Sequence, residues 1–134
     1  MKGLRIKGIG IGIKRLPWKV ALVLYAVLIF WLSSRPIPEG PTTLLRYDEF
    51  WHFFEYLLFG LLVWKASLPK SRKGLLLALS LSLSYAGSDE LHQLFVPTRT
   101  ASFQDWLLDG LGIGSGLLLG RFGFGGLHPR TFRV

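Results

Sequence analysis

Four long apolar segments dominate this sequence of 134 residues and leave few folds open to it. A bilayer core about 30 Å thick is crossed by roughly 20 helical residues, and each segment is close to that length. In lipid, only helices and closed barrels pair all of their backbone groups. The Leu-Ser alternation at 79–85 is strand-like, but one such segment cannot close a barrel. We therefore predict an all-α, polytopic membrane protein, a bundle of four transmembrane helices at 18–34, 50–68, 74–96 and 103–120.

The first apolar segment follows a basic region, as the core of a secretory signal does. No small-x-small cleavage motif ends it, and Arg35 and Pro36 come directly after it. We therefore expect an uncleaved first span. The chain then divides into a basic N-terminal arm at 1–17, a four-helix domain at 18–120 and a basic tail at 121–134.

The 16 Lys and Arg residues are unevenly distributed along the chain. All but Arg35, Arg46 and Arg99 lie near the N-terminus, near the connection between the second and third segments, or in the tail. Cytoplasmic loops are enriched in Lys and Arg, so we predict a multi-pass protein of the cell membrane with both termini cytoplasmic. The net charge is +8, but the basic residues lie between apolar segments and are not spread over a soluble domain. We therefore expect membrane lipids as partners and no nucleic acid.

With this orientation, all acidic residues lie on the outer side, in the outer connections or the outer halves of the spans. His52 and His92 share that region. The sequence therefore predicts a polar site on the extracytoplasmic side of the membrane.

Helical spacing gathers the polar residues of the last three segments onto single faces, because steps of three and four stack on one side of a helix. A carboxylate facing lipid is costly, so we expect these faces to turn toward neighbouring helices. The glycines form a GxxxGxxxG stripe, which permits close helix contact and leaves room for dimers. The three faces consist of Asp48, His52, Glu55 and Tyr56; of Ser84, Ser88, Asp89, His92 and Gln93; and of Asp105, Asp109, Gly112, Gly116 and Gly120.

Helix capping is an alternative explanation for two of the acids. Asp48 is placed to cap the second helix, and Ser102 with Asp105 fits a capping box at the start of the fourth. In both cases the carboxylate lies near the positive end of the helix dipole. A purely structural role for these two residues therefore stays open.

Capping does not explain Asp89, Glu90 and His92, because they lie late in their helix, where the dipole disfavours carboxylates. Arg99 is the nearest cation, and we expect its planar fork to pair with a carboxylate. One Arg cannot neutralise all of these acids, so the rest must bind protons, a metal or a cationic group of a ligand. Oxygen ligands favour Mg²⁺ or Ca²⁺, whereas two His favour Zn²⁺. The spacing matches no established metal signature, so the cofactor is left unassigned.

Taken together, the polar positions resemble the VanZ-like family of small bacterial membrane proteins. The resemblance covers about 48–120, with the first span also in place; Glu49 and Glu55 depart from the family pattern. It implies a four-helix membrane domain. The family's namesake is linked to resistance against the glycopeptide teicoplanin, and no reaction is securely attached to the family. The residues that carry the resemblance are Asp48, His52, Tyr56, Asp89, Glu90, His92, Gln93, Pro97, Arg99, Ser102, Asp105, Asp109 and Gly112.

Several functions remain open at this point. One is an enzyme that acts on a lipid-linked or cell-envelope substrate, and another is a non-catalytic protein that binds an antibiotic, a lipid headgroup or a cell-wall precursor. A third is a structural network of buried charges, and a proton carrier is disfavoured because the cytoplasmic halves of the spans hold almost no ionisable residue. Candidate catalytic residues are Asp48, His52, Glu90, His92 and Asp105; candidate substrate-binding residues are Tyr56, Asp89, Gln93, Arg99, Ser102 and Asp109.

Overall fold

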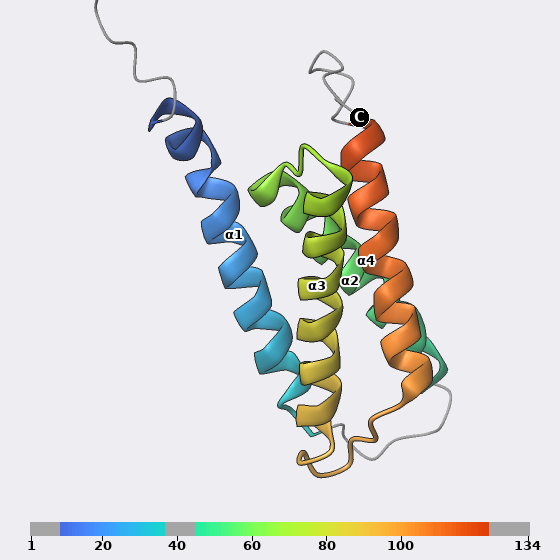
Figure 1. The fold of residues 1–134 in the computed structure, drawn as a ribbon. Coiled ribbons are helices and arrows are strands. Elements are labelled where there is room, and N and C mark those ends of the chain that lie inside the picture. The colour runs from blue at the N-terminus through green and yellow to red at the C-terminus, as the bar shows by residue number, and fades with distance from the viewer. Residues whose placement is uncertain (1–8, 37–44, 124–134) are drawn as a thin grey trace, which may run out of the picture.

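The computed structural model describes residues 9–36 and 45–123, and all regular structure in these two ranges is helical. The prediction of an all-α chain is therefore confirmed for this part. Each predicted span corresponds to one helix, and the ends agree within a few residues except at the start of the first. The helices are α1 (Ile9–Ser33), α2 (Leu45–Ser67), α3 (Arg72–Gln93) and α4 (Phe103–Gly123) (Figure 1).

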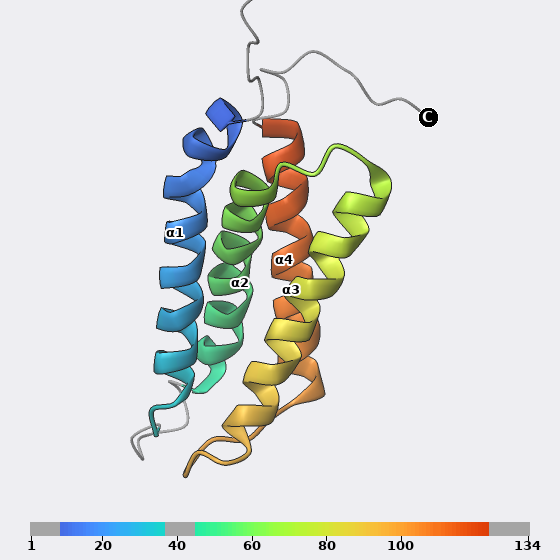
Figure 2. The ribbon, with the colours of Figure 1, turned by 60° about the vertical axis from the view of Figure 1, so that its left-hand side comes forward.

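The start of α1, the connection from α2 to α3 and the end of α4 lie at one end of the bundle (Figure 1). The connection from α3 to α4 lies at the opposite end, and the second view shows the same up-and-down arrangement (Figure 2). The first helix begins at Ile9 and includes Pro17, so residues 9–17 of the predicted N-terminal arm are helical and continuous with α1. The rest of the predicted arm lies outside the described residues.

Glycines allow α2 and α4 to pack at very short range, and this is the most extensive helix pair in the described residues. A Cβ atom at Gly112 or Gly116 would overlap the backbone oxygen of Phe53 or Leu57, and one at Gly60 would overlap the backbone of α4. The prediction that the glycine stripe permits close helix contact is therefore confirmed, and the partner is a helix of the same chain.

Two tyrosine hydroxyls attach α1 to the rest of the bundle. Tyr25 of α1 donates a hydrogen bond to the backbone oxygen of Glu55, 3.1 Å away, and Tyr85 of α3 donates one to the backbone oxygen of Ala26, 2.6 Å away. A backbone carbonyl oxygen has two lone pairs, and the helical hydrogen bond uses only one of them. The tyrosine hydroxyls use the other and so join α1 to its neighbours. The Tyr85 ring also stacks on Phe59 of the core, with ring centroids 5.0 Å apart.

Large apolar side chains cover the outside of the bundle, including Leu24 on α1, Leu81 on α3 and Phe122 on α4, each more than 60% exposed. Among the described residues, one helix, Lys14–Ser33, is long and apolar enough by composition to cross a membrane. The acidic, serine and glycine residues within α2, α3 and α4 lower the hydropathy of those helices. The apolar first helix supports membrane association.

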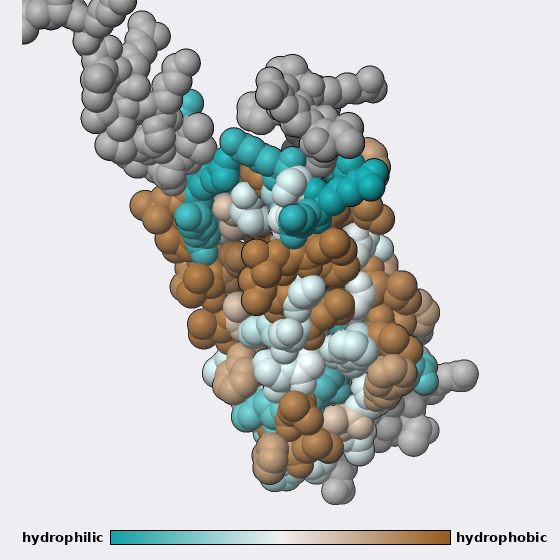
Figure 3. Space-filling view, in the orientation of Figure 1, coloured by the Kyte–Doolittle hydropathy of each residue, from teal (hydrophilic) through white to brown (hydrophobic). Residues whose placement is uncertain are grey.

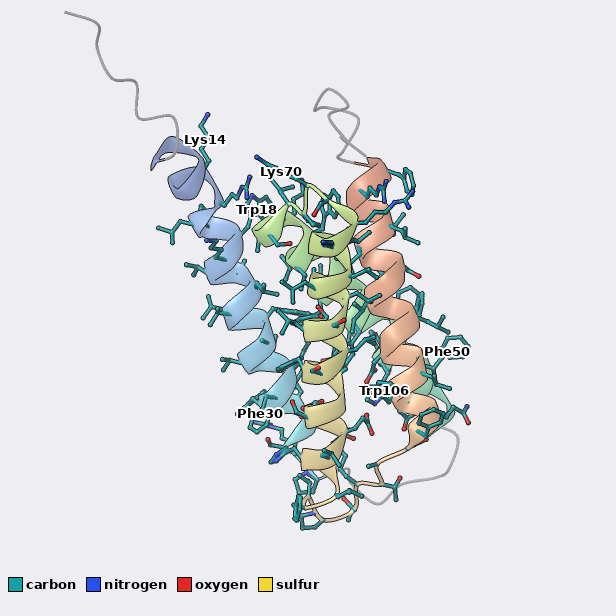
Figure 4. The ribbon with its side chains drawn as sticks, viewed as in Figure 1. Lys14, Trp18, Phe30, Phe50, Lys70 and Trp106 are labelled. Carbon is teal, nitrogen blue, oxygen red and sulfur yellow. The ribbon has the colours of Figure 1, made fainter. Side chains whose placement is uncertain are left out.

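The described lysines and carboxylates lie in opposite halves of the bundle. A hydrophilic band crosses the upper end, with hydrophobic side chains directly below it (Figure 3). Lys14 and Lys70 lie at this upper end (Figure 4). The acids whose side chains are described, namely Glu55, Asp89, Glu90, Asp105 and Asp109, lie in the opposite halves of their helices.

Candidate functional site

Three buried ionisable side chains, one from each of α2, α3 and α4, meet inside the bundle. They are His52, Glu90 and Asp109, and we refer to them as the His-Glu-Asp triad. Nδ1 of His52 lies 3.1 Å from Oδ1 of Asp109. One nitrogen of His52 and one oxygen of each carboxylate all lie within 4.8 Å of one another. The triad residues are 7%, 6% and 1% exposed in the order given, so protein surrounds the cluster on nearly all sides.

The start of α4 holds Glu90 in place. Oε2 of Glu90 accepts a hydrogen bond from the backbone N–H of Ser102, at 3.2 Å. Ser102 also caps α4, since its Oγ accepts from the backbone N–H groups of Gln104 and Asp105, which confirms the predicted cap. Oε1 of Glu90 is buried and has no hydrogen-bond partner among the described residues. One oxygen of this carboxylate is therefore anchored while the other is unsatisfied.

Asp89, the residue before Glu90, has a different environment. Its carboxylate accepts hydrogen bonds from Ser33 Oγ at 2.5 Å, from Tyr56 OH at 3.4 Å and from Gln93 Nε2 at 3.4 Å. The donors come from α1, α2 and α3, so this one buried carboxylate links three helices. Because three donors already satisfy it, its geometry fits a structural role.

His92 and Arg99 both contact the end of α1. Nε2 of His92 lies 2.9 Å from Ser34 Oγ, and its ring stacks on Phe30 with centroids 4.3 Å apart. Arg99 donates from Nε to the backbone oxygen of Arg35 and from Nη2 to that of Leu32, both at 3.2 Å. The expectation that Arg99 pairs with a carboxylate is therefore wrong for the described residues. Leu32 lies in the last turn of α1 and Arg35 follows that turn, and α1 ends close enough to the α3–α4 connection for Arg99 to reach both carbonyls.

The remaining predicted positions are distributed as follows. Asp105 lies in the first turn of α4, one turn before Asp109. Asp48 lies in the first turn of α2, and its side chain is outside the described residues. The expectation that Ser84 and Ser88 face a neighbouring helix is wrong, because both side chains are exposed. The buried stripe of α3 instead runs through Ala78, Ser82, Ala86, Asp89, Glu90 and Gln93.

A pocket of about 420 Å³ lies between α1, α2 and α3, toward the end of the bundle where the α3–α4 connection lies (Figure 1). Its polar lining includes Glu55, Asp89 and Arg99, and its apolar lining includes Leu28 and Phe54. His52 also lines the pocket, so the same side chain contacts both the pocket and the triad.

Comparison with known families decides the membership of the chain. The family model described as VanZ/LLP1 matches residues 20–124, which include most of α1 and all of the other three helices. The chain belongs to the VanZ-like family. The comparisons with curated proteins and with solved structures found no match.

In this VanZ-like protein the pocket and the triad offer different chemistry. The pocket combines the Arg99 guanidinium group, the Glu55 carboxylate and the Asp89 carboxylate, which three donors already satisfy, with apolar walls. Such a lining suits a ligand with a charged headgroup and a hydrocarbon chain. The triad combines one imidazole with two carboxylates, a set found in proton transfer and in metal binding. His52 connects the two regions.

Sequence reasoning missed the two serines at the end of α1 in this VanZ-like protein. Ser33 contacts Asp89, and Ser34 contacts His92. Polar residues at the end of an apolar segment are ordinarily expected to contact lipid headgroups, so a role for these serines inside the bundle was not predicted. The one available signal was that two adjacent hydroxyls end an otherwise apolar segment, on the side where the acids are predicted to lie.

Proposed function

We propose that this VanZ-like protein crosses the cell membrane four times, with both termini in the cytoplasm and the pocket at the extracytoplasmic end. Support comes from the excess of Lys and Arg at one end of the bundle and of carboxylates at the other. The large apolar side chains exposed along the helices match a lipid environment. A carboxylate within the hydrocarbon region is costly, and the burial of Asp89, Glu90 and Asp109 avoids that cost.

We further propose that the pocket binds an amphiphile of the cell envelope through its anionic headgroup, either a lipid-linked cell-wall precursor or a glycopeptide such as teicoplanin. The lining of the pocket carries this proposal. Among the described residues, Arg99 donates its hydrogen bonds to the neutral carbonyls of Leu32 and Arg35 and to no carboxylate. Leu28 and Phe54 border the same pocket and would contact the hydrocarbon part. The volume lies within the usual range for small-molecule sites, about 300–1,000 Å³.

Binding to the purified protein in nanodiscs tests the proposal. The probes are a polyprenyl phosphate, the polyprenol with the same tail and no phosphate, and teicoplanin. We expect the phosphate lipid or teicoplanin to raise the unfolding temperature, and the polyprenol to have a much smaller effect. Leu28→Trp, which fills the pocket, should remove the shift. Val27→Trp is the matched control, because Val27 is the preceding residue of α1, is 62% exposed and does not line the pocket.

Two results would contradict the proposal. One is the absence of any shift with both anionic probes, and the other is an equal shift in wild type and Leu28→Trp. Arg99→Gln provides a second comparison, since it removes the charge that the headgroup is proposed to contact. Because Arg99 also caps α1, the unfolding temperature of Arg99→Gln without a probe serves as its own baseline.

An enzyme acting on the bound amphiphile is the second candidate, and the position of His52 favours it. An imidazole that lines the pocket and contacts a carboxylate is arranged as a general base would be. Release of inorganic phosphate from the polyprenyl phosphate probe, abolished in His52→Ala, would support catalysis. Binding without release in the wild type would support a non-catalytic binding protein whose buried charges are mainly structural.

A further inference from the structure

We propose that the His-Glu-Asp triad binds one divalent transition-metal ion, of the class of Zn²⁺ or Mn²⁺. The proposal concerns the interior between α2, α3 and α4 and goes beyond the pocket function. It stands on the positions of three side chains and on one unsatisfied buried atom. It does not require that the pocket bind any ligand.

The spacing of the donor atoms supports a metal site. Ligands that bind a metal at about 2.0–2.2 Å lie about 3.0–3.5 Å from each other when they occupy adjacent positions. Nδ1 of His52 and Oδ1 of Asp109 are 3.1 Å apart, which lies within this range. One ligand atom of Glu90 lies within 4.8 Å of the ligand atoms of His52 and Asp109, close enough for the three residues to share one ion.

The charge of the triad gives a second, independent argument. Neither Glu90 nor Asp109 forms an ion pair with a Lys or Arg among the described residues, and the single ion pair of Asp109 is with His52. An imidazole that ligates a metal must first give up its proton, and the triad then carries a charge of about −2, which one divalent ion neutralises. Buried charges without such compensation are costly.

The unsatisfied Oε1 of Glu90 points to the same conclusion. Glu90 is 94% buried, and its other oxygen already accepts the Ser102 amide. A buried carboxylate oxygen without a donor is unusual in native proteins. A metal ion supplies the missing partner, and the Ser102 amide then acts as an outer hydrogen bond that orients the ligand, as is common around metal sites.

The ligand types select the class of metal. An imidazole favours transition metals over Mg²⁺ and Ca²⁺, whereas carboxylates are compatible with all of them. Three protein ligands leave at least one coordination position for water or for a substrate group. His52 lies at the border of the pocket, so that open position is near the region proposed to hold a headgroup.

Metal binding is tested on the full chain purified in detergent, stripped with a chelator and dialysed, without any lipid probe. We expect isothermal titration to show about one high-affinity ion per chain for Zn²⁺ or Mn²⁺ and much weaker binding of Mg²⁺. Glu90→Gln and Asp109→Asn should each weaken the affinity by about 100-fold or more, since loss of an outer-shell partner alone costs about 10–100-fold. Asp89→Asn is the matched control, because it removes a buried carboxylate on the same helix outside the triad, and it should bind the ion as the wild type does.

Co²⁺ gives a test that needs no variant. Co²⁺ bound by the triad should show visible d–d absorption bands, which should disappear when Zn²⁺ displaces the Co²⁺.

Three results would overturn the proposal. The wild type could bind no ion, its affinity could equal that of Glu90→Gln and Asp109→Asn, or Asp89→Asn could lose as much affinity as those two variants. If Glu90→Gln does not fold, loss of the Co²⁺ spectrum in Asp109→Asn decides the question. Failure of the pocket proposal would instead appear as an unchanged response to the lipid probes, whatever the metal result.

Discussion

The Ser33 hydroxyl at the end of α1 donates a hydrogen bond to the Asp89 carboxylate of α3, across a helix pair whose backbones come close at few positions. Tyr56 of α2 and Gln93 of α3 complete the donors around that carboxylate. One acid therefore fixes the relative positions of three helices at the end of the bundle where the pocket lies.

Asp89→Ala is expected to destabilise the protein by about 2–4 kcal/mol, because it leaves buried donors without an acceptor. Asp89→Asn keeps one acceptor oxygen and should lose less. Thermal unfolding in detergent, followed by Trp fluorescence, measures both. An unfolding temperature for Asp89→Ala equal to that of the wild type would show that these hydrogen bonds do not stabilise the bundle.

The glycine stripe gives a prediction with a built-in control. Gly116→Ala places a methyl group against the backbone of α2 and should destabilise the protein by about 3 kcal/mol or more. Gly114→Ala adds the same methyl group where nothing lies within 4 Å, and its better helix propensity should stabilise α4 by up to about 1 kcal/mol. Unfolding temperatures of the two variants should therefore move in opposite directions. Equal shifts would argue against the close α2–α4 contact.

Tyr85→Phe removes the hydroxyl that contacts Ala26 while keeping the ring stacked on Phe59. We expect a loss of about 1 kcal/mol, the usual contribution of one such hydrogen bond. The loss should appear in the attachment of α1, measured as faster amide hydrogen exchange around Ala26. Unchanged exchange there would indicate that apolar packing alone holds α1.

The proposed topology predicts which positions can be labelled from outside the cell. The chain has no Cys, so a single introduced Cys reports one position without background. A membrane-impermeant maleimide should label Phe95→Cys in intact cells, because Phe95 is 84% exposed beyond the end of α3. Lys70→Cys, in the connection between α2 and α3, should react only after the membrane is permeabilised. The opposite pattern would reverse the orientation.

The sequence predicted the helices well because long apolar segments and a regular glycine spacing are local signals. The cap at Ser102 was predictable for the same reason. Which face of α3 is buried was much harder to predict from the sequence. Ser84 and Ser88 share a helical stripe by their spacing, yet Asp89 and Gln93 lie on a neighbouring stripe with Ser82 and are the residues that the bundle buries.

The partners of the charged residues were the least predictable part. Arg99 and the acids are close in sequence and of opposite charge, which made an ion pair the simplest expectation. The carbonyls of Leu32 and Arg35, distant in sequence, take the guanidinium because α1 happens to end beside it. Likewise, helical spacing placed His52 and Asp109 on inward faces but did not include Glu90 with the polar face of the third segment. Only the packing of three helices brings these three residues together while leaving His92 apart.

The close packing of α2 against α4 has a mechanical consequence. Backbones in direct contact cannot slide or separate without losing that contact, so these two helices form the rigid half of the molecule. The opposite wall of the pocket is α1, whose polar attachments are a few hydroxyl and guanidinium hydrogen bonds. Under the proposed function, an amphiphile that enters the pocket from the lipid would therefore displace α1 and leave the contact between α2 and α4 unchanged.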